Sequence, residues 1–183
     1  MVKRYLIVSD NHGSMRNLKR VVKSFRGKIE AVIHCGDIEA DPDALEELAG
    51  CPVYVARGNC DFYFSRDDEA LFEMGDHVAL VTHGDRYGIS WGCGDLIERA
   101  QMMGADLVFF GHTHRPAYHV FKDENVTMLN PGSIDRPRQF EPHGPTFAVL
   151  DLHEDGRIEP TFFLLDWKTG KKVYTFDIED YQR

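Results

Sequence analysis

Short apolar runs recur along the whole chain, and polar or glycine residues follow each of them. Five such runs in the first 110 residues are rich in β-branched or aromatic side chains, a composition typical of strands. They cover residues 5–8, 31–33, 53–56, 78–81 and 107–110. We therefore predict five strands in this part of the chain, each with polar residues just beyond its end.

Between these strands, apolar residues repeat every three to four positions, which is the spacing of a helix with one buried side. In the segment 14–25 they recur from Leu18 to Phe25. The segments 43–48 and 94–103 show the same periodicity. We predict three helices and expect all of them to pack on the same sheet.

From about residue 117 the chain changes to short β-rich runs separated by turns, a pattern that predicts antiparallel strands. These runs cover residues 118–121, 126–129, 147–150 and 160–164. A β-α-β-α half followed by a half of this kind predicts an α/β fold in which a two-sheet β-sandwich is flanked by helices. We expect one domain across residues 1–183, with a C-terminal hairpin extension at about 160–183.

Side chains that bind metals stand just after the first five predicted strands. They are Asp10, His12, Asp37, Asn59, His83, His112 and His114. Asp10 and His12 are two positions apart, so on an extended chain both side chains would point the same way, and the two later histidines repeat this spacing. Carboxylate, imidazole and amide ligands without a thiolate suit divalent ions such as Mn²⁺, Fe²⁺, Co²⁺ or Zn²⁺.

Composition narrows the classes of protein that the chain can belong to. The formal net charge of -9 argues against a non-specific nucleic-acid binder, because that mode of binding needs clustered Lys and Arg. Its apolar runs are far shorter than the ~20 residues that cross a bilayer, and the N-terminus does not resemble a signal peptide. The four cysteines form no C-x-x-C pair, which favours reduced thiols. We expect a cytoplasmic protein that has no membrane partner.

Five motifs, in this order, resemble those of the calcineurin-like metallophosphoesterases. They are Asp10-Asn11-His12, Gly36-Asp37, Gly58-Asn59-Cys60-Asp61, His83-Gly84 and Gly111-His112-Thr113-His114. The resemblance runs from Tyr5 to about Leu152. It is strongest to the small single-domain bacterial and archaeal phosphodiesterases, which share the segment Asn130-Pro131-Gly132-Ser133.

This resemblance implies a site with two metal ions and assigns each candidate ligand to it. One metal would be held by Asp10, His12 and His114, the other by Asn59, His83 and His112, and Asp37 would bridge them. The implied reaction is hydrolysis of a small phosphodiester, in which a hydroxide that bridges the two ions attacks phosphorus in line. Mn²⁺ is the expected metal, with Fe²⁺, Co²⁺, Ni²⁺ and Zn²⁺ as alternatives.

Residues that contact the substrate are less well defined by the motifs. Asn59 is expected to lie near the phosphoryl group, while Asp37 would act in catalysis through the metals. Cys60 stands where many members of the family have a histidine that is proposed to protonate the leaving group. A thiol with a reference pKa of ~8.5 is a poor general acid at neutral pH. Further candidates for holding phosphate are Arg136, Arg138 and His143.

Two other functions stay open on the sequence alone. A metal-binding scaffold or regulatory protein would keep the fold without physiological catalysis, as in the retromer scaffold subunit that resembles this family. A phosphomonoesterase would bind a substrate with one more negative charge, and the absent histidine argues mildly against it. Edge strands in the second half of the chain would also allow a homo-oligomer.

Overall fold

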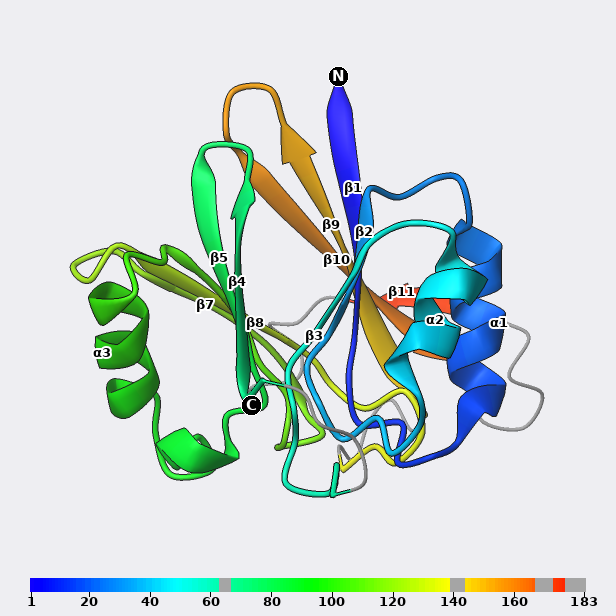
Figure 1. Ribbon diagram of the computed structural model, residues 1–183. Helices are drawn as coiled ribbons and strands as arrows, with labels where there is room; N and C mark the ends of the chain where they lie inside the picture. Colours follow the sequence, from blue (N-terminus) through cyan, green and yellow to red (C-terminus); the bar gives the residue numbers. More distant parts are fainter. Residues whose placement is uncertain (63–66, 139–143, 167–172, 177–183) are drawn as a thin grey trace.

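Two mixed β-sheets pack face to face, and helices cover their outer sides (Figure 1). The computed structural model describes residues 1–62, 67–138, 144–166 and 173–176. Its strands are β1 (Val2–Val8), β2 (Ala31–His34), β3 (Val53–Val55), β4 (Glu69–Met74), β5 (His77–Thr82), β6 (Leu107–Phe109), β7 (Pro116–Phe121), β8 (Val126–Pro131), β9 (Thr146–His153), β10 (Ile158–Leu165) and β11 (Val173–Phe176). The α/β sandwich predicted from the sequence is confirmed.

The first sheet has the strand order β11-β10-β9-β1-β2-β3, and the second has the order β4-β5-β6-β8-β7. Strands β1, β2 and β3 are parallel to one another, and so are β5, β6 and β8. The prediction that the second half is purely antiparallel is wrong for β8. This strand is antiparallel to β7 but parallel to β6, because the chain crosses back to reach the middle of the sheet.

The apolar runs of the central strands are continuous because both of their faces are buried. In β1, Ile7 faces the second sheet, while its neighbours Leu6 and Val8 face the helices on the outside. The core between the sheets also contains Ile33 of β2 and Phe109 of β6, and neither is exposed. One strand therefore contributes to two cores through its alternating side chains.

The predicted helices form, as α1 (Met15–Phe25), α2 (Pro42–Ala49) and α3 (Gly94–Met102), but they do not share one sheet. Helices α1 and α2 pack on the first sheet, whereas α3 packs its Leu96 and Ala100 on the second (Figure 1). The expectation that all three cover the same sheet is therefore wrong. Periodicity shows that a helix has an apolar side, but it does not identify the sheet that this side covers.

Capping residues fix the ends of α2. The side chain of Asp41 accepts a hydrogen bond from the backbone N–H of Asp43, and Pro42 occupies the first turn, where its missing N–H is no loss. At the other end Gly50 adopts the left-handed conformation that commonly terminates helices. Local signals of this kind explain why the position of this helix could be predicted closely.

Two features near the sheet edges complete the fold. Strand β4 was not predicted, because Glu69 and Glu73 interrupt its apolar residues. Strand β11 forms one edge of the first sheet, where it pairs antiparallel with β10. Strand β10 in turn pairs with β9. The segment between β10 and β11 lies outside the described residues. Within the described part of the chain, every helix is too short or too polar to cross a membrane.

Candidate metal centre

The seven predicted ligand residues follow the carboxyl ends of strands from both sheets. Backbone hydrogen bonds hold these strand ends together. The N–H of Asp10 donates to the carbonyl of Gly36, and the N–H of Gly111 donates to the carbonyl of His83. Parallel strands present their carboxyl ends at one edge of a sheet, which is where open α/β sheets commonly place their ligands.

A first group of ligand atoms gathers around Asp10. Its Oδ1 lies 3.1 Å from Nε2 of His114 and 3.9 Å from Nε2 of His12. The two histidine Nε2 atoms are themselves 3.1 Å apart. Together these three side chains form one of the groups whose atoms lie close enough to hold a metal ion.

The outer nitrogens of these two histidines determine what their inner nitrogens can do. Nδ1 of His114 faces the backbone carbonyl of Arg136, and Nδ1 of His12 lies 2.8 Å from a carboxylate oxygen of Glu39. Both partners can only accept hydrogen bonds, so both Nδ1 atoms carry the proton. In the neutral imidazoles, each Nε2 therefore presents a lone pair to the shared space beside Asp10.

A cation fits this arrangement. Oδ1 of Asp10 is buried, and among the described residues it has no hydrogen-bond donor. The other oxygen, Oδ2, accepts from the hydroxyl of Ser9 at 2.5 Å. Buried carboxylate oxygens without a partner are costly, and here the nearest atoms offer more lone pairs. A divalent ion would satisfy the carboxylate and both imidazoles at once.

A second group gathers around Asn59. Its side-chain Oδ1 lies 3.1 Å from Nε2 of His83 and 3.2 Å from Nδ1 of His112. The buried His83 donates from Nδ1 to the carbonyl of Cys35 at 2.7 Å, which again directs the Nε2 lone pair of a neutral ring inward. Hydrogen bonds from metal-binding histidines to carbonyls commonly orient the ring in this way.

Asp37 stands between the two groups. Its Oδ2 lies 3.8 Å from Nε2 of His12 and 3.4 Å from Nε2 of His83. Its other oxygen, Oδ1, accepts a hydrogen bond of 2.7 Å from the backbone N–H of Cys60. One carboxylate oxygen is thus anchored to the protein, while the other faces the inner nitrogens of both groups.

The residue spacing predicts an extended backbone at the paired ligands, but the backbone there is not extended. Five of the seven predicted ligands have positive φ angles, namely Asp10, His12, Asp37, His112 and His114, with values from 45° to 65°. Left-handed backbone in a residue other than glycine costs of order 1 kcal/mol or more, and it concentrates at functional sites. The paired residues therefore converge because the chain coils tightly after each strand, and the prediction of extended dipeptides is wrong.

Close packing behind the ligands requires glycine at particular points. A Cβ on Gly111 would lie 2.2 Å from Oγ of Ser9 and 2.8 Å from Oδ2 of Asp10. A Cβ on Gly58 would lie 2.2 Å from Oδ1 of Asp37. These glycines allow the backbone to pass directly against the carboxylates.

Several polar residues that hold the loops in place were not assigned a role from the sequence. Ser133 donates from its hydroxyl to the carbonyl of Asp10, and Asn130 donates from its amide to the carbonyl of Gly111. Asp61 accepts from the backbone N–H groups of Gly58 and Glu39. In the sequence, the segment 130–133 and Asp61 stand out only as parts of motifs, because hydrogen bonds of this kind leave no signal in residue spacing.

Glu39 is the other residue that the sequence did not single out. Its carboxylate contacts Nδ1 of His12, its backbone φ is positive at 47°, and it forms a further candidate metal group with His12 and Cys60. We expect Glu39→Gln to weaken metal binding by about 10–100-fold, because the amide can present its N–H group to His12 and favour the wrong tautomer. Competition with a fluorescent chelator would measure this affinity.

Glu124 offers the matched control for that substitution, since it is an exposed glutamate in the turn between β7 and β8. Glu124→Gln should leave the affinity unchanged. Equal affinities for the Glu39 and Glu124 variants would show that Glu39 does not orient His12.

Charges within the centre shift the pKa values of its buried members. Burial raises the pKa of Asp37, but the hydrogen bond to His83 and the charge of that ring hold it well below its usual range. Burial lowers the pKa of His83, yet the hydrogen bond to Asp37 and the charge of Asp10 outweigh this and raise it to about 9. A histidine must lose its proton to bind a metal, so a proton and a cation compete for this pair.

Cys60 contributes mainly through its backbone. Burial, followed by the charge of Asp37, raises the pKa of its thiol to about 12. The thiol therefore stays protonated at neutral pH and is a weak proton donor. Meanwhile its N–H anchors Oδ1 of Asp37, as described above.

The three residues predicted to hold phosphate, Arg136, Arg138 and His143, do not form one group in the described structure. Arg136 contributes its backbone carbonyl to His114, while its side chain is 63% exposed beside Asp135. Arg138 lines a cavity next to the centre, and its N–H donates to the carbonyl of His114. His143 lies outside the described residues.

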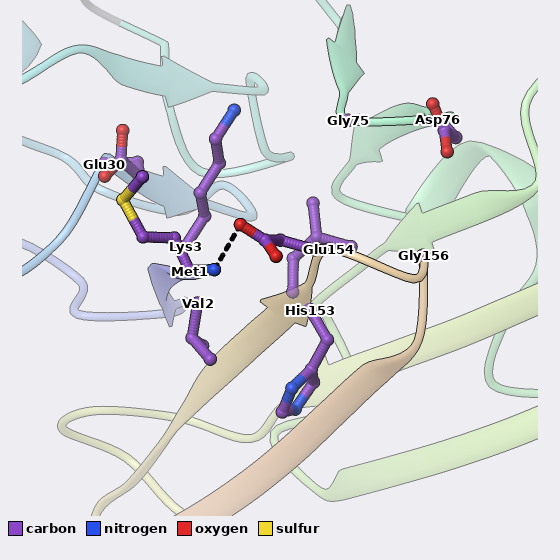
Figure 2. Close-up of a pocket in the computed structure, with 10 residues that line it drawn as sticks. Met1, Val2, Lys3, Glu30, Gly75, Asp76, His153, Glu154 and Gly156 are labelled. Atoms are coloured by element: carbon purple, nitrogen blue, oxygen red, sulfur yellow. Dashed lines mark ion pairs between the residues drawn. The ribbon is translucent and has the colours of Figure 1, made fainter.

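A separate cavity of about 350 Å³, drawn in Figure 2, lies where β1 begins, whereas Asp10 and His12 follow the other end of that strand. It is formed by the first residues of β1 and by the turn between β9 and β10, and the N-terminal ammonium of Met1 pairs there with Glu154. None of the seven predicted ligands lines it. This cavity is therefore not part of the candidate centre.

Known proteins share both the sequence and the fold. Residues 4–155 match the family model described as "Calcineurin-like phosphoesterase superfamily domain". A probable metallophosphoesterase of Bacillus subtilis is 38% identical over 152 residues, which are 82% of this chain and 85% of the relative. A phosphodiesterase of Methanocaldococcus jannaschii is 27% identical over 165 residues, which are 81% of this chain and 92% of the relative.

A solved structure from Streptococcus pneumoniae, described as a predicted phosphoesterase, has the same fold. It matches with a TM-score of 0.79 at 28% identity and covers 96% of this chain and 99% of its own. The two sheets and their strand ends are therefore an arrangement that is also found in a relative of the same size.

Proposed function

We propose a hydrolytic function from one premise: the chain belongs to the calcineurin-like phosphoesterase superfamily. The proposal is that it is a metal-dependent phosphodiesterase whose centre holds two divalent ions. Asp10, His12 and His114 would hold one ion, and Asn59, His83 and His112 would hold the other. Asp37 would contact both.

The observation that carries this proposal is the position of Oδ2 of Asp37. It faces Nε2 of His12 in the first group and Nε2 of His83 in the second, at 3.8 Å and 3.4 Å. A carboxylate oxygen placed in this way supports a bridging role. The unpartnered Oδ1 of Asp10 supports the first metal position independently.

The chain's own residues position the reactants. When bound, two divalent cations lower the pKa of a water molecule and neutralise charge on the phosphoryl oxygens. Asn59 presents a neutral oxygen at the partly exposed side of the centre, where its amide can also reach a phosphoryl oxygen. Asp37 is kept in place by the N–H of Cys60, and the protein supplies no nucleophile of its own.

The proposed substrate is a diester rather than a monoester, because the extra negative charge of a monoester makes its leaving group depend more on a proton donor. The thiol of Cys60, with its pKa raised to about 12 by burial and by Asp37, is a weak proton donor for a leaving group. Esters whose leaving group departs without a proton should therefore react fastest. The similarity to a protein named phosphodiesterase agrees with this preference.

The test is hydrolysis by protein that has been stripped of metal and then given Mn²⁺. We expect turnover of bis(p-nitrophenyl) phosphate to appear only after Mn²⁺ is restored, and to exceed turnover of p-nitrophenyl phosphate. Elemental analysis of the same samples should find two metal ions per chain. Two bound ions without turnover of either ester would instead indicate a metal-stabilised binding protein, and faster turnover of the monoester would indicate a phosphomonoesterase.

Mn²⁺ is the proposed metal, and Fe²⁺, Co²⁺, Ni²⁺ and Zn²⁺ stay as alternatives because nitrogen and oxygen ligands accept all of them. Titrating each ion against turnover would rank the metals.

The single-domain organisation, the cytoplasmic location and a homo-oligomeric state stay predictions.

A further inference from the structure

Two cavities of similar size flank the candidate centre, and they differ in charge. One, of about 280 Å³, adjoins Asn59 and contains Arg57 and Arg86. The other, of about 370 Å³, adjoins Thr113, which stands between His112 and His114, and contains Arg115 and Arg138. Both are open to substrate groups that extend beyond a phosphorus atom at the centre.

In the cavity beside Asn59, one carboxylate pairs with both arginines. Asp68 accepts from Arg57, with its Oδ1 2.9 Å from Nε and 2.6 Å from Nη2, and it also pairs with Arg86. Asp61 and Asp85 line the same cavity. Three aspartates thus face two arginines among the lining residues, so the fixed charge on this side is negative and does not attract an anion.

In the cavity beside Thr113, no carboxylate of the described residues pairs with the arginines. Among the described residues, neither Arg115 nor Arg138 has a carboxylate within ion-pair distance, and no Asp or Glu lines this cavity. The chain has a formal net charge of -9, so two arginines in one cavity make this part of the surface positive on a negatively charged protein. Guanidinium groups bind phosphate in a bidentate manner.

The remaining walls of this cavity suit an organic group that carries the phosphate. Ile89 and Phe110 are mostly buried and present an apolar surface. Burial lowers the pKa of His119, so its ring is neutral at neutral pH and can exchange hydrogen bonds with a sugar or a base. Among the described residues that line the cavity, Arg115 and Arg138 therefore supply its positive charge.

The position of Arg138 connects the cavity to the centre. Its backbone N–H donates to the carbonyl of His114 at 3.2 Å. The hydroxyl of Thr113, in the same wall, accepts from the amide of Asn130, which also donates to Gly111. The loops that carry the proposed metal ligands thus also form the wall of the cavity.

We propose that the cavity of Arg115 and Arg138 is a subsite for a second phosphate, so that the substrates are phosphodiesters in which one ester group is itself a phosphorylated nucleoside. This inference rests on the proposed function, because the subsite selects among diesters hydrolysed at the neighbouring centre. The cavity beside Asn59 receives the uncharged ester group.

Two esters with the same scissile bond test the subsite: thymidine 3′-(p-nitrophenyl phosphate), with and without a 5′-phosphate. We expect kcat/KM to be about tenfold higher for the 5′-phosphorylated ester, as one charge-assisted contact predicts. The ratio should fall toward one in the double variant Arg115→Gln/Arg138→Gln. Arg157→Gln, which removes an exposed arginine in the turn between β9 and β10, should keep the wild-type ratio.

A binding measurement separates failure of the subsite from failure of the proposed function. Calorimetry with Mn²⁺-loaded protein would compare thymidine 3′,5′-bisphosphate with thymidine 3′-phosphate, and needs no turnover. Tighter binding of the bisphosphate that is lost in the double variant supports the subsite, even if both esters prove inert and the phosphodiesterase proposal fails. A wild-type ratio of one in both experiments, or a preference that persists in the double variant, would overturn it.

Discussion

Replacing Asp37 by asparagine is expected to lower kcat/KM for bis(p-nitrophenyl) phosphate by about 1000-fold or more, which corresponds to roughly 4 kcal/mol of transition-state stabilisation. Oδ1 of Asp37 accepts the N–H of Cys60, so asparagine would keep its carbonyl oxygen there. Its NH₂ group would then occupy the place of Oδ2, facing His12 and His83. An amide nitrogen that carries protons cannot bind a cation.

The same variant should remain folded, because the amide preserves the size of the side chain and the anchoring hydrogen bond. Asp123→Asn, at an exposed position in the turn between β7 and β8, is the matched control and should retain wild-type activity. Circular dichroism would confirm the fold of both variants. Activity within tenfold of wild type in Asp37→Asn would disprove the bridging role.

Gly111→Ala is expected to destabilise the fold by about 1–3 kcal/mol through overpacking and to weaken metal binding as well. The added Cβ would meet Oγ of Ser9 at 2.2 Å and Oδ2 of Asp10 at 2.8 Å. Both groups are buried and bonded to each other at 2.5 Å, so neither can move without breaking that bond. Because the φ angle of Gly111 is not positive, the effect would be steric rather than conformational.

Urea unfolding of metal-free protein would measure this stability loss. Gly92→Ala is the matched control, since a Cβ at Gly92 meets nothing within 4 Å and its φ is not positive either. We expect the control to be neutral within about 0.5 kcal/mol. A neutral Gly111→Ala would mean that the loop behind Asp10 can yield, which the close packing described above argues against.

Much of the fold could be predicted because the central strands are buried on both faces, and their apolar runs are therefore unbroken. The same reasoning failed where burial is partial. Strand β4 has Glu69 and Glu73 among its apolar residues and gave no clear pattern. The placement of α3 on the second sheet, and the parallel pairing of β8 with β6, depend on crossovers that local sequence does not encode.

For the candidate centre, residue type and order predict which side chains lie close together. The backbone conformation that brings them together is seen only in the structure. His12 and His114 come together across 102 sequence positions through left-handed turns that no spacing rule anticipates. Glu39, in the loop after β2, contacts Nδ1 of His12, which lies in the loop after β1. In the sequence alone, Glu39 cannot be distinguished from an ordinary surface glutamate. Contacts between loops of this kind depend on tertiary packing rather than on a motif.

Each proposed metal position draws ligands from both sheets. Asp10 and His12 follow a strand of the first sheet and meet His114 of the second, while Asn59 of the first meets His83 of the second. The apolar layer between the sheets, which includes Ile33 and Phe109, sets the distance between these two groups of ligands. A substitution deep in that layer would thus affect the reaction from a distance. A small shift of one sheet relative to the other would change the distances between the ligands at both proposed metal positions.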